Sequence, residues 1–505
     1  MVKLAQRVLK NSIYNSLGVL VTTLGGLIYT VILARLLLPE LFGLYHLALS
    51  VGLLLLTFTN LGVHDTLIRY VSHAIGEEDH TLARSYVRYL FKIKIILSLS
   101  TSAILIFSAD LLALQIFHKP EISPLLAIVG LYIFFQSLLE FVSSLFISLQ
   151  KFELLTIRYV VYESARLILV PCFIIMGYGV GGALLGLVIS VIFSLIVPNY
   201  FIFSSYKLIF KGPVCPIERR KILRFLGYLT FGSVSGAMFT YVDSIMLGIF
   251  MAAEYVGYYR AAFNIVIAFM GLVSISSVLF PVFTQMDKSE LDNAFNRVFK
   301  YSSVISFPSA FGLIFLSDII IRAVYGVDYL PAVIPMQVIA LLVIIYPFSL
   351  FGVLFNAREM PEIPAKLTAI FSILNIVMNY FFILEWGIMG AAVATVFCRY
   401  LNVISFGILS RRILGISPSM DFMYKPLLSS IIMLCYLYII PGPSGVLSTA
   451  LVILTAAIVY LSSMVVMKGL LREDLIYICE VVGKGALLDK MVKILKLELK
   501  GNGKN

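Results

Sequence analysis

The sequence predicts an all-α polytopic membrane protein with fourteen transmembrane helices, arranged as two six-helix parallel repeats and two extra C-terminal helices. Three observations predict this fold. Hydrophobic residues make up 60% of the chain, charged residues make up 13% and the mean hydropathy is +1.00, whereas about 25% of the residues in a soluble domain are charged. Apolar stretches long enough to cross a bilayer core of about 30 Å recur along the chain. Two short motifs occur once in each half.

The first six apolar stretches are predicted to form the helices of the first repeat. Lipid offers no hydrogen bonds to the backbone, so only helices and closed barrels cross it, and barrel strands would be about ten alternating residues long. The stretch at 13–36 is longer than the apolar core of a cleavable signal peptide, which has about 7–15 residues, so we expect it to remain as the first span. The predicted spans are 13–36, 40–61, 88–109, 124–149, 156–176 and 180–204.

A second set of six stretches predicts the second repeat, and two further stretches follow it. Polar turns or Pro and Gly residues separate them, as is typical of helix ends. The predicted spans are 224–250, 255–280, 297–317, 332–356, 365–385 and 388–410, followed by 425–440 and 446–467. The predicted domains are an N-terminal lobe at 1–210, a C-terminal lobe at 211–412, two helices at 413–468 and a basic amphipathic cytoplasmic tail at 469–505.

The basic residues of the loops are divided unequally between the two sides of this arrangement. With the N-terminus in the cytoplasm, the outer side holds only Arg35, Lys119 and Arg322, as the positive-inside rule requires. The sequence therefore predicts an even number of spans, both termini in the cytoplasm, and insertion in the cytoplasmic (plasma) membrane. The basic residues behind the formal net charge of +11 are distributed according to the predicted spans, so this charge does not indicate a nucleic-acid partner.

The residues after the last predicted span form a basic tail that ends in LLDKMVKILKLELKGNGKN. Its lysines alternate with apolar residues at helical spacing. Two interpretations stay open: an interfacial helix that is attracted to anionic membrane lipids, or a solvated tail that only follows the positive-inside rule.

Two pairs of matching segments indicate an internal duplication. They are PELFGLYHLA at 39–48 with AEYVGYYRAA at 253–262, and GVGGALLG at 179–186 with GIMGAAVA at 387–394. The first match pairs Gly43 with Gly257 and His46 with Arg260. Six spans begin and end on the same side, so the two copies insert in the same orientation, as parallel repeats with a cleft between them near the membrane midplane.

A resemblance to a known family rests on three segments: ARLLLPELFGLYHLA at 34–48, YVDSIMLGIFMAAEYVGYYRAA at 241–262 and LFNAREMPEIPAKL at 354–367. With six, six and two predicted spans, the chain resembles the polysaccharide biosynthesis (Wzx-type) flippases of the multidrug/oligosaccharidyl-lipid/polysaccharide exporter superfamily. The resemblance implies two six-helix lobes in a V-shaped arrangement and a polyprenyl-diphosphate-linked oligosaccharide as the substrate. It also implies membrane lipids and polysaccharide assembly proteins as partners.

Ionisable residues within the predicted spans are functional candidates, because each costs at least about 2.5–3.5 kcal/mol at the bilayer centre. Asp243 and Arg260 lie at nearly equal predicted depth on consecutive spans, which predicts a structural ion pair. The alternative is that Arg260 faces the cleft and Asp243 orients it or binds a coupling cation. Glu140 and Arg166 are predicted to pair in the same way, with Glu163 one helical turn from Arg166.

Other polar residues are candidates for substrate contacts. Arg399 lies near the middle of its span without an acid at the same depth, so we expect it to face water and to bind a diphosphate through its planar donors. Arg35 either lines the exit or snorkels to the interface, and Asn375 and Asn379 either bind sugar hydroxyls or join helices. The predicted substrate-binding residues are Arg399, Arg260, Arg35, His46, Asn264, Asn375 and Asn379.

Motifs for other chemistries are absent from the sequence. No Walker-type phosphate loop, His-Glu-x-x-His or Asp-x-Asp motif occurs, so we expect no ATP site, no metal site, no cofactor and no enzymatic activity. Two alternatives to a flippase stay open. A cation-coupled multidrug exporter of the same fold would favour acids in its cavity, and a membrane glycosyltransferase or ligase is disfavoured by the short outer loops.

Overall fold

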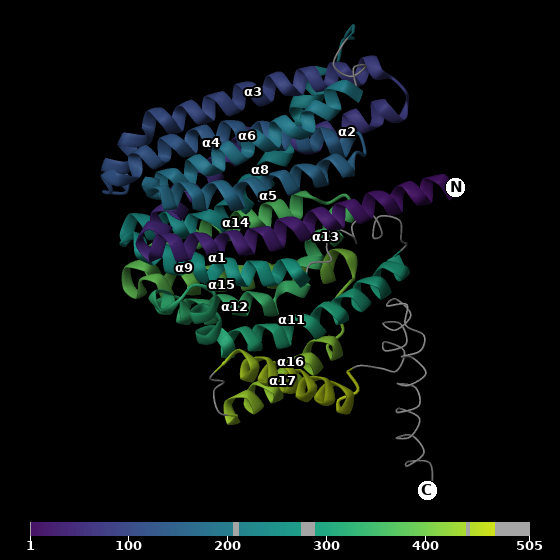
Figure 1. Cartoon of the computed structure of the whole chain (residues 1–505). Helices are drawn as coiled ribbons and strands as arrows, with labels where there is room; N and C mark the ends of the chain where they lie inside the picture. The colour runs from purple at the N-terminus through teal and green to yellow at the C-terminus, as the bar shows by residue number, and fades with distance from the viewer. Residues whose placement is uncertain (1, 206–211, 274–287, 441–444, 470–505) are drawn as a thin grey trace. The chain divides into compact units, whose positions relative to one another are not determined.

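The computed structural model describes residues 2–205, 212–273, 288–440 and 445–469, and all regular structure in these ranges is helical (Figure 1). Eleven helical segments within them are long and apolar enough to cross a membrane. The predicted all-helical, multi-pass membrane protein is therefore confirmed. The C-terminal tail predicted at 469–505 lies, beyond Gly469, outside the described residues.

The chain divides into two compact units. The first comprises Met1–Gln285 and Leu316–Gly415, and the second comprises Met286–Phe315 and Ile416–Asn505. Both predicted lobes contribute helices to the first unit, and it holds every residue that the sequence analysis proposed for the site. The site can therefore be described within this unit alone.

The N-terminal helices of the first unit begin with one long helix that is interrupted by a kink. Leu38, directly before Pro39, leaves the helical region at this kink with a φ of 60°. Proline removes a backbone donor, and its ring disfavours a helical conformation of the residue before it, so the helix is interrupted here. The kink separates the predicted spans 13–36 and 40–61. The helices are α1 (Val2–Asn60), α2 (Val63–Gly76), α3 (His80–Leu111), α4 (Ser123–Ser148), α5 (Phe152–Phe173) and α6 (Gly179–Ser205).

The C-terminal helices of the first unit include a break where one continuous span was expected. Pro347 lies in a short helical turn between two helices, so the predicted span 332–356 is divided there. The helices are α8 (Arg219–Phe250), α9 (Ala253–Val273), α11 (Lys288–Val324, which begins in the second unit), α12 (Val333–Ile344), α13 (Leu350–Ala357), α14 (Glu362–Trp386) and α15 (Ile388–Leu409).

The second unit contains α16 (Asp421–Ile439), α17 (Val446–Val466) and the first part of α11. Apolar side chains join these three segments, with Met433 of α16 and Met464 of α17 in the buried centre and Phe311 of α11 packed against it. The hydroxyl of Tyr460 donates a hydrogen bond to the carbonyl of Val304 at 2.8 Å.

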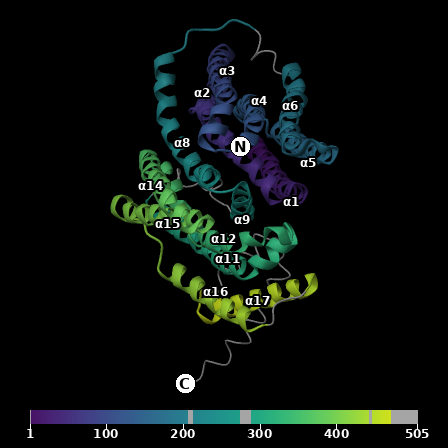
Figure 2. The same cartoon turned by 90° about the vertical axis from the view of Figure 1, so that its left-hand side faces the viewer.

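The helices α1 and α9 cross at the centre of the first unit. Figure 2 shows α2 to α6 on one side of this crossing and α12, α14 and α15 on the other. At the crossing, a Cβ added to Gly43 would lie 1.8 Å from the carbonyl oxygen of Ala253, and one added to Gly257 would lie 2.2 Å from that of Pro39. The two glycines that the sequence match pairs are therefore in contact, and each must lack a side chain.

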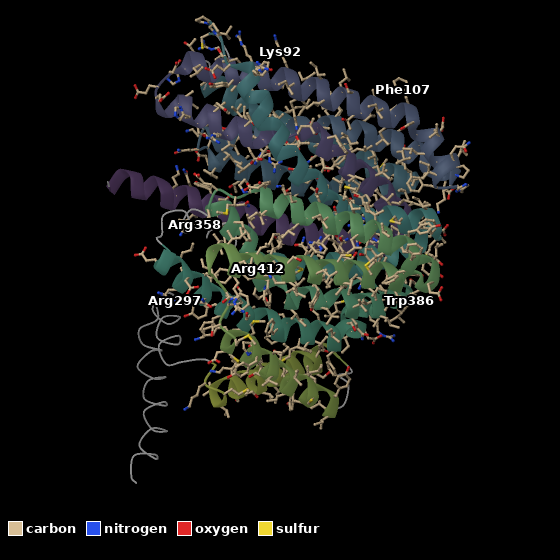
Figure 3. All side chains as sticks on the ribbon, turned by 180° about the vertical axis from the view of Figure 1, so that it is seen from behind. Lys92, Phe107, Arg297, Arg358, Trp386 and Arg412 are labelled. Carbon is tan, nitrogen blue, oxygen red and sulfur yellow. The ribbon has the colours of Figure 1, made fainter. Side chains whose placement is uncertain are left out.

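The charged residues that end the helices of the first unit are not evenly placed. Figure 3 shows Arg358 and Arg412 toward one end of the helices, whereas Phe107 and Trp386 lie toward the opposite end. The two labelled arginines and the two labelled aromatic residues of the first unit thus lie at opposite ends of its helices.

Candidate functional site

A cavity of about 510 Å³ lies between the N-terminal and C-terminal helices of the first unit, and we call it the arginine cavity. Its walls come from α1, α4, α5 and α6 on one side and from α8 and α9 on the other. Among its described lining residues the charged side chains are Arg166 and Arg260, and there is no Asp or Glu. The lining residues with polar side chains are Thr23, Tyr29, Thr30, Tyr45, His46, Ser50, Tyr132, Tyr162, Arg166, Thr240, Tyr241, Arg260 and Asn264.

Arg260 lies on α9 and lines this cavity. It forms no ion pair within the described chain, so no acid neutralises its positive charge directly. It is 6% exposed. Its Nη2 donates to Ser50 Oγ at 2.9 Å and to the carbonyl of Thr240 at 3.3 Å, and its buried Nε has no partner. The predicted ion pair between Asp243 and Arg260 is therefore wrong, because Arg260 is held by neutral oxygens instead.

Asp243 lies on α8 and is 1% exposed. Its carboxylate accepts hydrogen bonds from Tyr259 Oη at 2.6 Å, from Asn379 Nδ2 at 2.7 Å and from Thr395 Oγ1. Asn375 joins the same network through Asn379 and Thr395. Three neutral donors can satisfy a buried carboxylate without a cation.

Asn375 and Asn379 are fully buried in this network and do not line the described cavities. Their expected place among the substrate contacts is therefore corrected. They join α14 to α8 and α15, which is the alternative use that the sequence left open.

Arg166 lies on the opposite wall of the arginine cavity, on α5. It forms an ion pair with Glu163, as the sequence predicted, and its guanidinium carbon lies 4.2 Å from the centre of the Tyr29 ring. Glu140, the other predicted partner, pairs with Lys94 at 3.5 Å. The predicted pair between Glu140 and Arg166 is therefore wrong.

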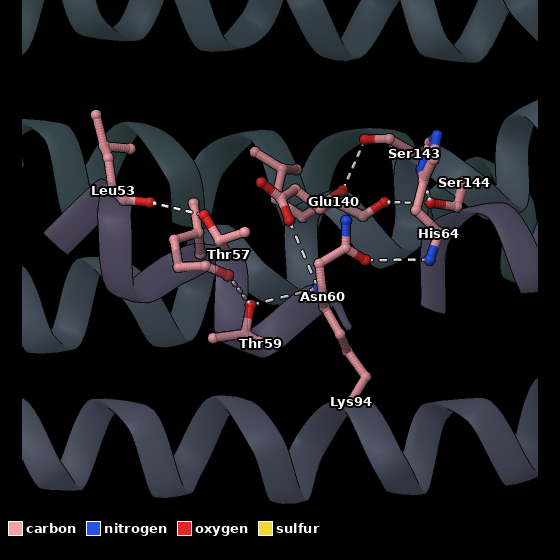
Figure 4. A network of polar contacts seen from close by, with 11 residues as sticks. Leu53, Thr57, Thr59, Asn60, His64, Lys94, Glu140, Ser143 and Ser144 are labelled. Atoms are coloured by element: carbon pink, nitrogen blue, oxygen red, sulfur yellow. Dashed lines mark hydrogen bonds and ion pairs between the residues drawn. The ribbon is translucent and has the colours of Figure 1, made fainter. Parts of the chain in front are cut away.

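Lys94, which lies within the predicted span 88–109, is a buried residue of α3 with a side chain that is 1% exposed. Figure 4 shows its amino group between Glu140 and Thr59, whose Oγ1 is 3.5 Å away. His64 and Ser144 extend the network beside Glu140, with His64 Nδ1 and Ser144 Oγ 2.6 Å apart. Apolar neighbours in the segment FKIKIIL are the only sequence signal of this burial.

Arg399 lines a second cavity, of about 370 Å³, together with Phe239 and Asn402. Its Nη2 donates to the carbonyl of Phe239 at 3.4 Å, and its buried Nε has no partner. A third cavity, of about 350 Å³, is lined by Glu140 and other polar residues, and we call it the glutamate cavity. Thr240 on α8 lines all three cavities, so they are neighbours along one helix.

The sequence match between α1 and α9 places related residues around the arginine cavity. Its register pairs His46 with Arg260 and, one turn on, Ser50 with Asn264, and all four line the cavity. His46 lies edge-on to Phe42, with ring centres 4.4 Å apart, and its buried Nε2 has no partner within the described chain. His46 and Asn264 therefore line the cavity, and their contact with a substrate stays a prediction.

Arg35 does not line any of the described cavities. It is exposed and donates from Nε to the carbonyl of Val324 at 2.9 Å, and from Nη2 to the carbonyl of Ala323. These carbonyls end α11, where a cation is favoured by the helix dipole. The position of Arg35 is explained by this capping, not by a contact with the cavity.

Lys119 joins the two halves of the first unit, a role that sequence reasoning missed. It follows α3, and its Nζ donates to the carbonyls of Gly248 at 2.6 Å and Met251 at 3.0 Å, where α8 ends. Free carbonyls at a helix end favour a cation. Burial lowers the pKa of Lys119 below its ordinary value, and nearby Glu121 acts in the opposite direction.

Among the residues that the structure describes, no group of three or more His, Cys, Asp or Glu side chains is placed to hold a metal ion. The arrangement offers a guanidinium-lined cavity for an anion, a buried carboxylate with neutral partners behind it, and a polar cavity beside it.

Comparison with known proteins gives a family and a fold. The family described as "Polysaccharide biosynthesis protein" matches residues 8–287. The "Probable low-salt glycan biosynthesis flippase Agl15" of Haloferax volcanii is 26% identical over 191 residues, which is 37% of this chain and 40% of that protein. The chain thus matches less than half the length of this relative.

Two further similarities extend over most of the chain. The "Putative O-antigen transporter" of Shigella flexneri is 21% identical over 405 residues, covering 77% of this chain and 94% of that protein. The solved structure of "Lipid II flippase MurJ, inward closed conformation" has a TM-score of 0.74 at 21% identity, covering 90% of this chain and 98% of that one. At this identity the structural likeness shows the fold.

Proposed function

The chain belongs to the polysaccharide biosynthesis protein family, and on this premise we propose that it is a flippase for a polyprenyl-diphosphate-linked oligosaccharide. It moves this lipid across the cytoplasmic membrane by alternating access, for the assembly of a surface polysaccharide or other glycan. The names of two relatives, a glycan biosynthesis flippase and an O-antigen transporter, support this substrate class. The protein acts as a transporter, not as an enzyme, and assembly proteins are its expected partners.

One observation carries the proposal: the arginine cavity is lined by Arg166 and Arg260 without an acid among its described lining residues. A diphosphate is an anion with several acceptor oxygens, which suits planar guanidinium donors. The buried Nε of Arg260 has no partner, so a donor is free for a ligand that enters. An exporter of cationic drugs would need the opposite charge in its cavity, and a glycosyltransferase is disfavoured because the sequence contains no Asp-x-Asp motif.

The proposed topology has fourteen crossings, with two six-helix repeats followed by α16 and α17. It counts α1 as two crossings divided at Leu38, and α12 with α13 as one crossing divided at Pro347. The contact between Gly43 and Gly257 supports a pseudo-symmetry axis through the α1–α9 crossing. We place both termini in the cytoplasm and the Lys119 contact on the outer side.

Asp243 is proposed as the residue that couples transport to a cation. Its carboxylate is fully enclosed and bound by neutral donors, so a small cation would meet a negative charge that no ion pair in the described chain has cancelled. This proposal stands apart from substrate binding, because Asp243 does not line the arginine cavity.

The proposed function is tested with purified protein in liposomes that contain a polyprenyl-diphosphate sugar, by measuring transbilayer movement. Arg260→Ala and Arg399→Ala should each slow flipping by roughly tenfold or more, because a hydrogen bond to a charged group contributes about 1.5–3 kcal/mol. Arg322→Ala is the matched control, since Arg322 is exposed and paired with Asp318 at 2.8 Å, away from the cavities. Flipping at the parent rate in both cavity variants contradicts the cationic-cavity mechanism.

A further inference from the structure

The glutamate cavity is a separate polar compartment next to the arginine cavity. The two share Leu53, Thr240 and Tyr241 as lining residues, so a ligand bound in one reaches the edge of the other. Its volume of about 350 Å³ is within the range of small-molecule sites, about 300–1,000 Å³. Its lining residues are Leu53, Leu56, Thr57, Asn60, Gln136, Glu140, Gly236, Ala237, Thr240 and Tyr241.

Glu140 lines this cavity with a carboxylate whose negative charge is balanced by the buried amino group of Lys94. Lys94 Nζ lies 3.5 Å from Glu140 Oε2, and the Lys94 side chain is 1% exposed whereas that of Glu140 is 33% exposed. Within the described residues Oε1 takes part in no hydrogen bond or ion pair. The pair is neutral as a whole, so it can accept from hydroxyl groups without strongly repelling an anion in the adjoining cavity.

Two amides complete the set of polar groups. Gln136 lies one turn before Glu140 on α4, and its buried Oε1 has no hydrogen-bond partner within the described chain. Asn60 ends α1, and its Oδ1 accepts from the backbone of His64 at 3.1 Å, which leaves its Nδ2 as a donor (Figure 4). The cavity lining therefore offers both hydrogen-bond donors and acceptors, together with the side chain of Tyr241.

We propose that the glutamate cavity binds the sugar attached to the diphosphate, through its hydroxyl groups, while Arg260 binds the diphosphate. A carboxylate oxygen, two amides and two threonine hydroxyls suit the donors and acceptors of a neutral sugar. In the lipid headgroup the diphosphate is bonded directly to this sugar. The two cavities likewise adjoin, since both are lined by Thr240 and Tyr241, so one headgroup can occupy both. This inference rests on the proposed function and adds to it the part of the site that recognises the sugar.

The test measures lipid binding to the purified full chain. The probes are a polyprenyl diphosphate carrying glucose, galactose or N-acetylglucosamine, and the same polyprenyl diphosphate without sugar. The parent should bind at least one sugar-bearing probe about tenfold more tightly than the sugarless one, since two or three hydrogen bonds contribute roughly 1.4 kcal/mol after desolvation. Gln136→Leu should remove most of this difference and leave sugarless binding unchanged.

The variants are chosen so that folding does not decide the result. Gln136→Leu keeps the Lys94–Glu140 pair, and in the described structure Gln136 Oε1 makes no hydrogen bond to lose. Arg260→Ala should weaken binding of all four probes, because it removes a diphosphate contact. Glu153→Gln is the control, since Glu153 pairs with Lys151 at 3.8 Å and lines none of the described cavities.

Two results overturn the proposal. The first is a parent that binds the sugarless lipid as tightly as every sugar-bearing one, and the second is a Gln136→Leu variant that weakens both kinds of lipid equally. If the parent moves the sugar-bearing lipid in liposomes and either result is found, the sugar subsite is wrong while the flippase function stands. If the parent binds none of the four lipids, the proposed function itself is wrong.

Discussion

Asp243 shows how the cost of an acid inside a membrane protein is met by neutral groups. Tyr259, Asn379 and Thr395 donate to its carboxylate from three different helices, so the charge is dispersed over hydrogen bonds and not over a counter-ion. Arg260 forms no ion pair within the described chain, so its positive charge is available to a ligand in the arginine cavity. Asp243 and Arg260 were expected to neutralise each other in an ion pair. Instead, Asp243 belongs to a buried hydrogen-bond network and Arg260 lines the arginine cavity.

A prediction follows for ion coupling. Asp243→Asn keeps the shape of the side chain but lacks the charge that would attract a cation, so it should remove any acceleration of flipping by an imposed sodium or proton gradient. Binding of the lipid-linked substrate should stay near the parent value. The measurement is flipping in liposomes with and without each gradient, with Asp318→Asn as an exposed control. A gradient response that survives in Asp243→Asn assigns this carboxylate a structural role only.

The buried pair of Lys94 and Glu140 allows a prediction about stability. Removing one partner of a buried pair leaves an unpaired charge and costs up to about 3–5 kcal/mol. Lys94 is the more enclosed of the two, so Glu140→Leu should lower the thermal midpoint more than Lys94→Met does. Thermal unfolding in detergent measures this, and the double variant should recover part of the loss. Equal effects of the two single variants would contradict the unequal exposure of the two side chains, on which this prediction rests.

These residues also show what a sequence can predict about a membrane site. Arg260 and Asn264 were singled out as polar residues within a predicted span, and His46 as the repeat partner of Arg260, and all three line the cavity. The ion pairs with Arg260 and Glu140 were predicted wrongly because equal depth does not fix which face of a helix a residue occupies. Helix rotation follows from side-chain packing between helices, which apolar length alone does not encode.

At the scale of elements, the α1–α9 crossing depends on two glycines. Gly43→Ala should push the backbone of α1 away from Ala253, and overpacking of this kind costs about 1–3 kcal/mol. We expect a lower thermal midpoint in detergent and slower flipping. Gly76→Ala is the matched control, because a Cβ there meets nothing within 4 Å and alanine favours the helix. If both variants unfold at the parent temperature, the two helices are not in contact in the membrane.

Long apolar elements were predicted well, whereas polar helices and interruptions were not. Residues 63–76 lie outside every predicted span, but they form the amphipathic helix α2, with Val63, Leu67 and Val71 packed against α3 and α4. A helix of fourteen residues with one apolar face is too short and too polar to be found by membrane-length hydropathy. The kink at Leu38 was predictable, because Pro39 follows it.

At the scale of the whole molecule, substrate movement requires the halves of the first unit to separate at one end and then at the other. Lys119 bonds the end of α8, and Tyr329 donates from the other half to the carbonyl of Ala34 at 3.0 Å. Two charge-assisted bonds at one lysine hold the two halves together at this end. The arginine cavity should therefore be reached from the cytoplasmic side in the resting state, if the Lys119 end faces outward.

The final prediction tests this closure. Lys119→Met removes both bonds to α8, and because bonds to a charged group contribute about 1.5–3 kcal/mol each, the population open to the outside should rise by tenfold or more. The measurement is labelling of Ser50→Cys, in a variant without the native cysteines, by a membrane-impermeant maleimide added outside whole cells. Lys119→Arg, which keeps a cation at the helix end, should label slowly like the parent. Ser50 is the labelled position because it lines the cavity beside Arg260. Labelling that is equally slow in Lys119→Met would mean that other contacts close this end. Fast labelling in the parent would mean that the cavity is open to the outside in the resting state.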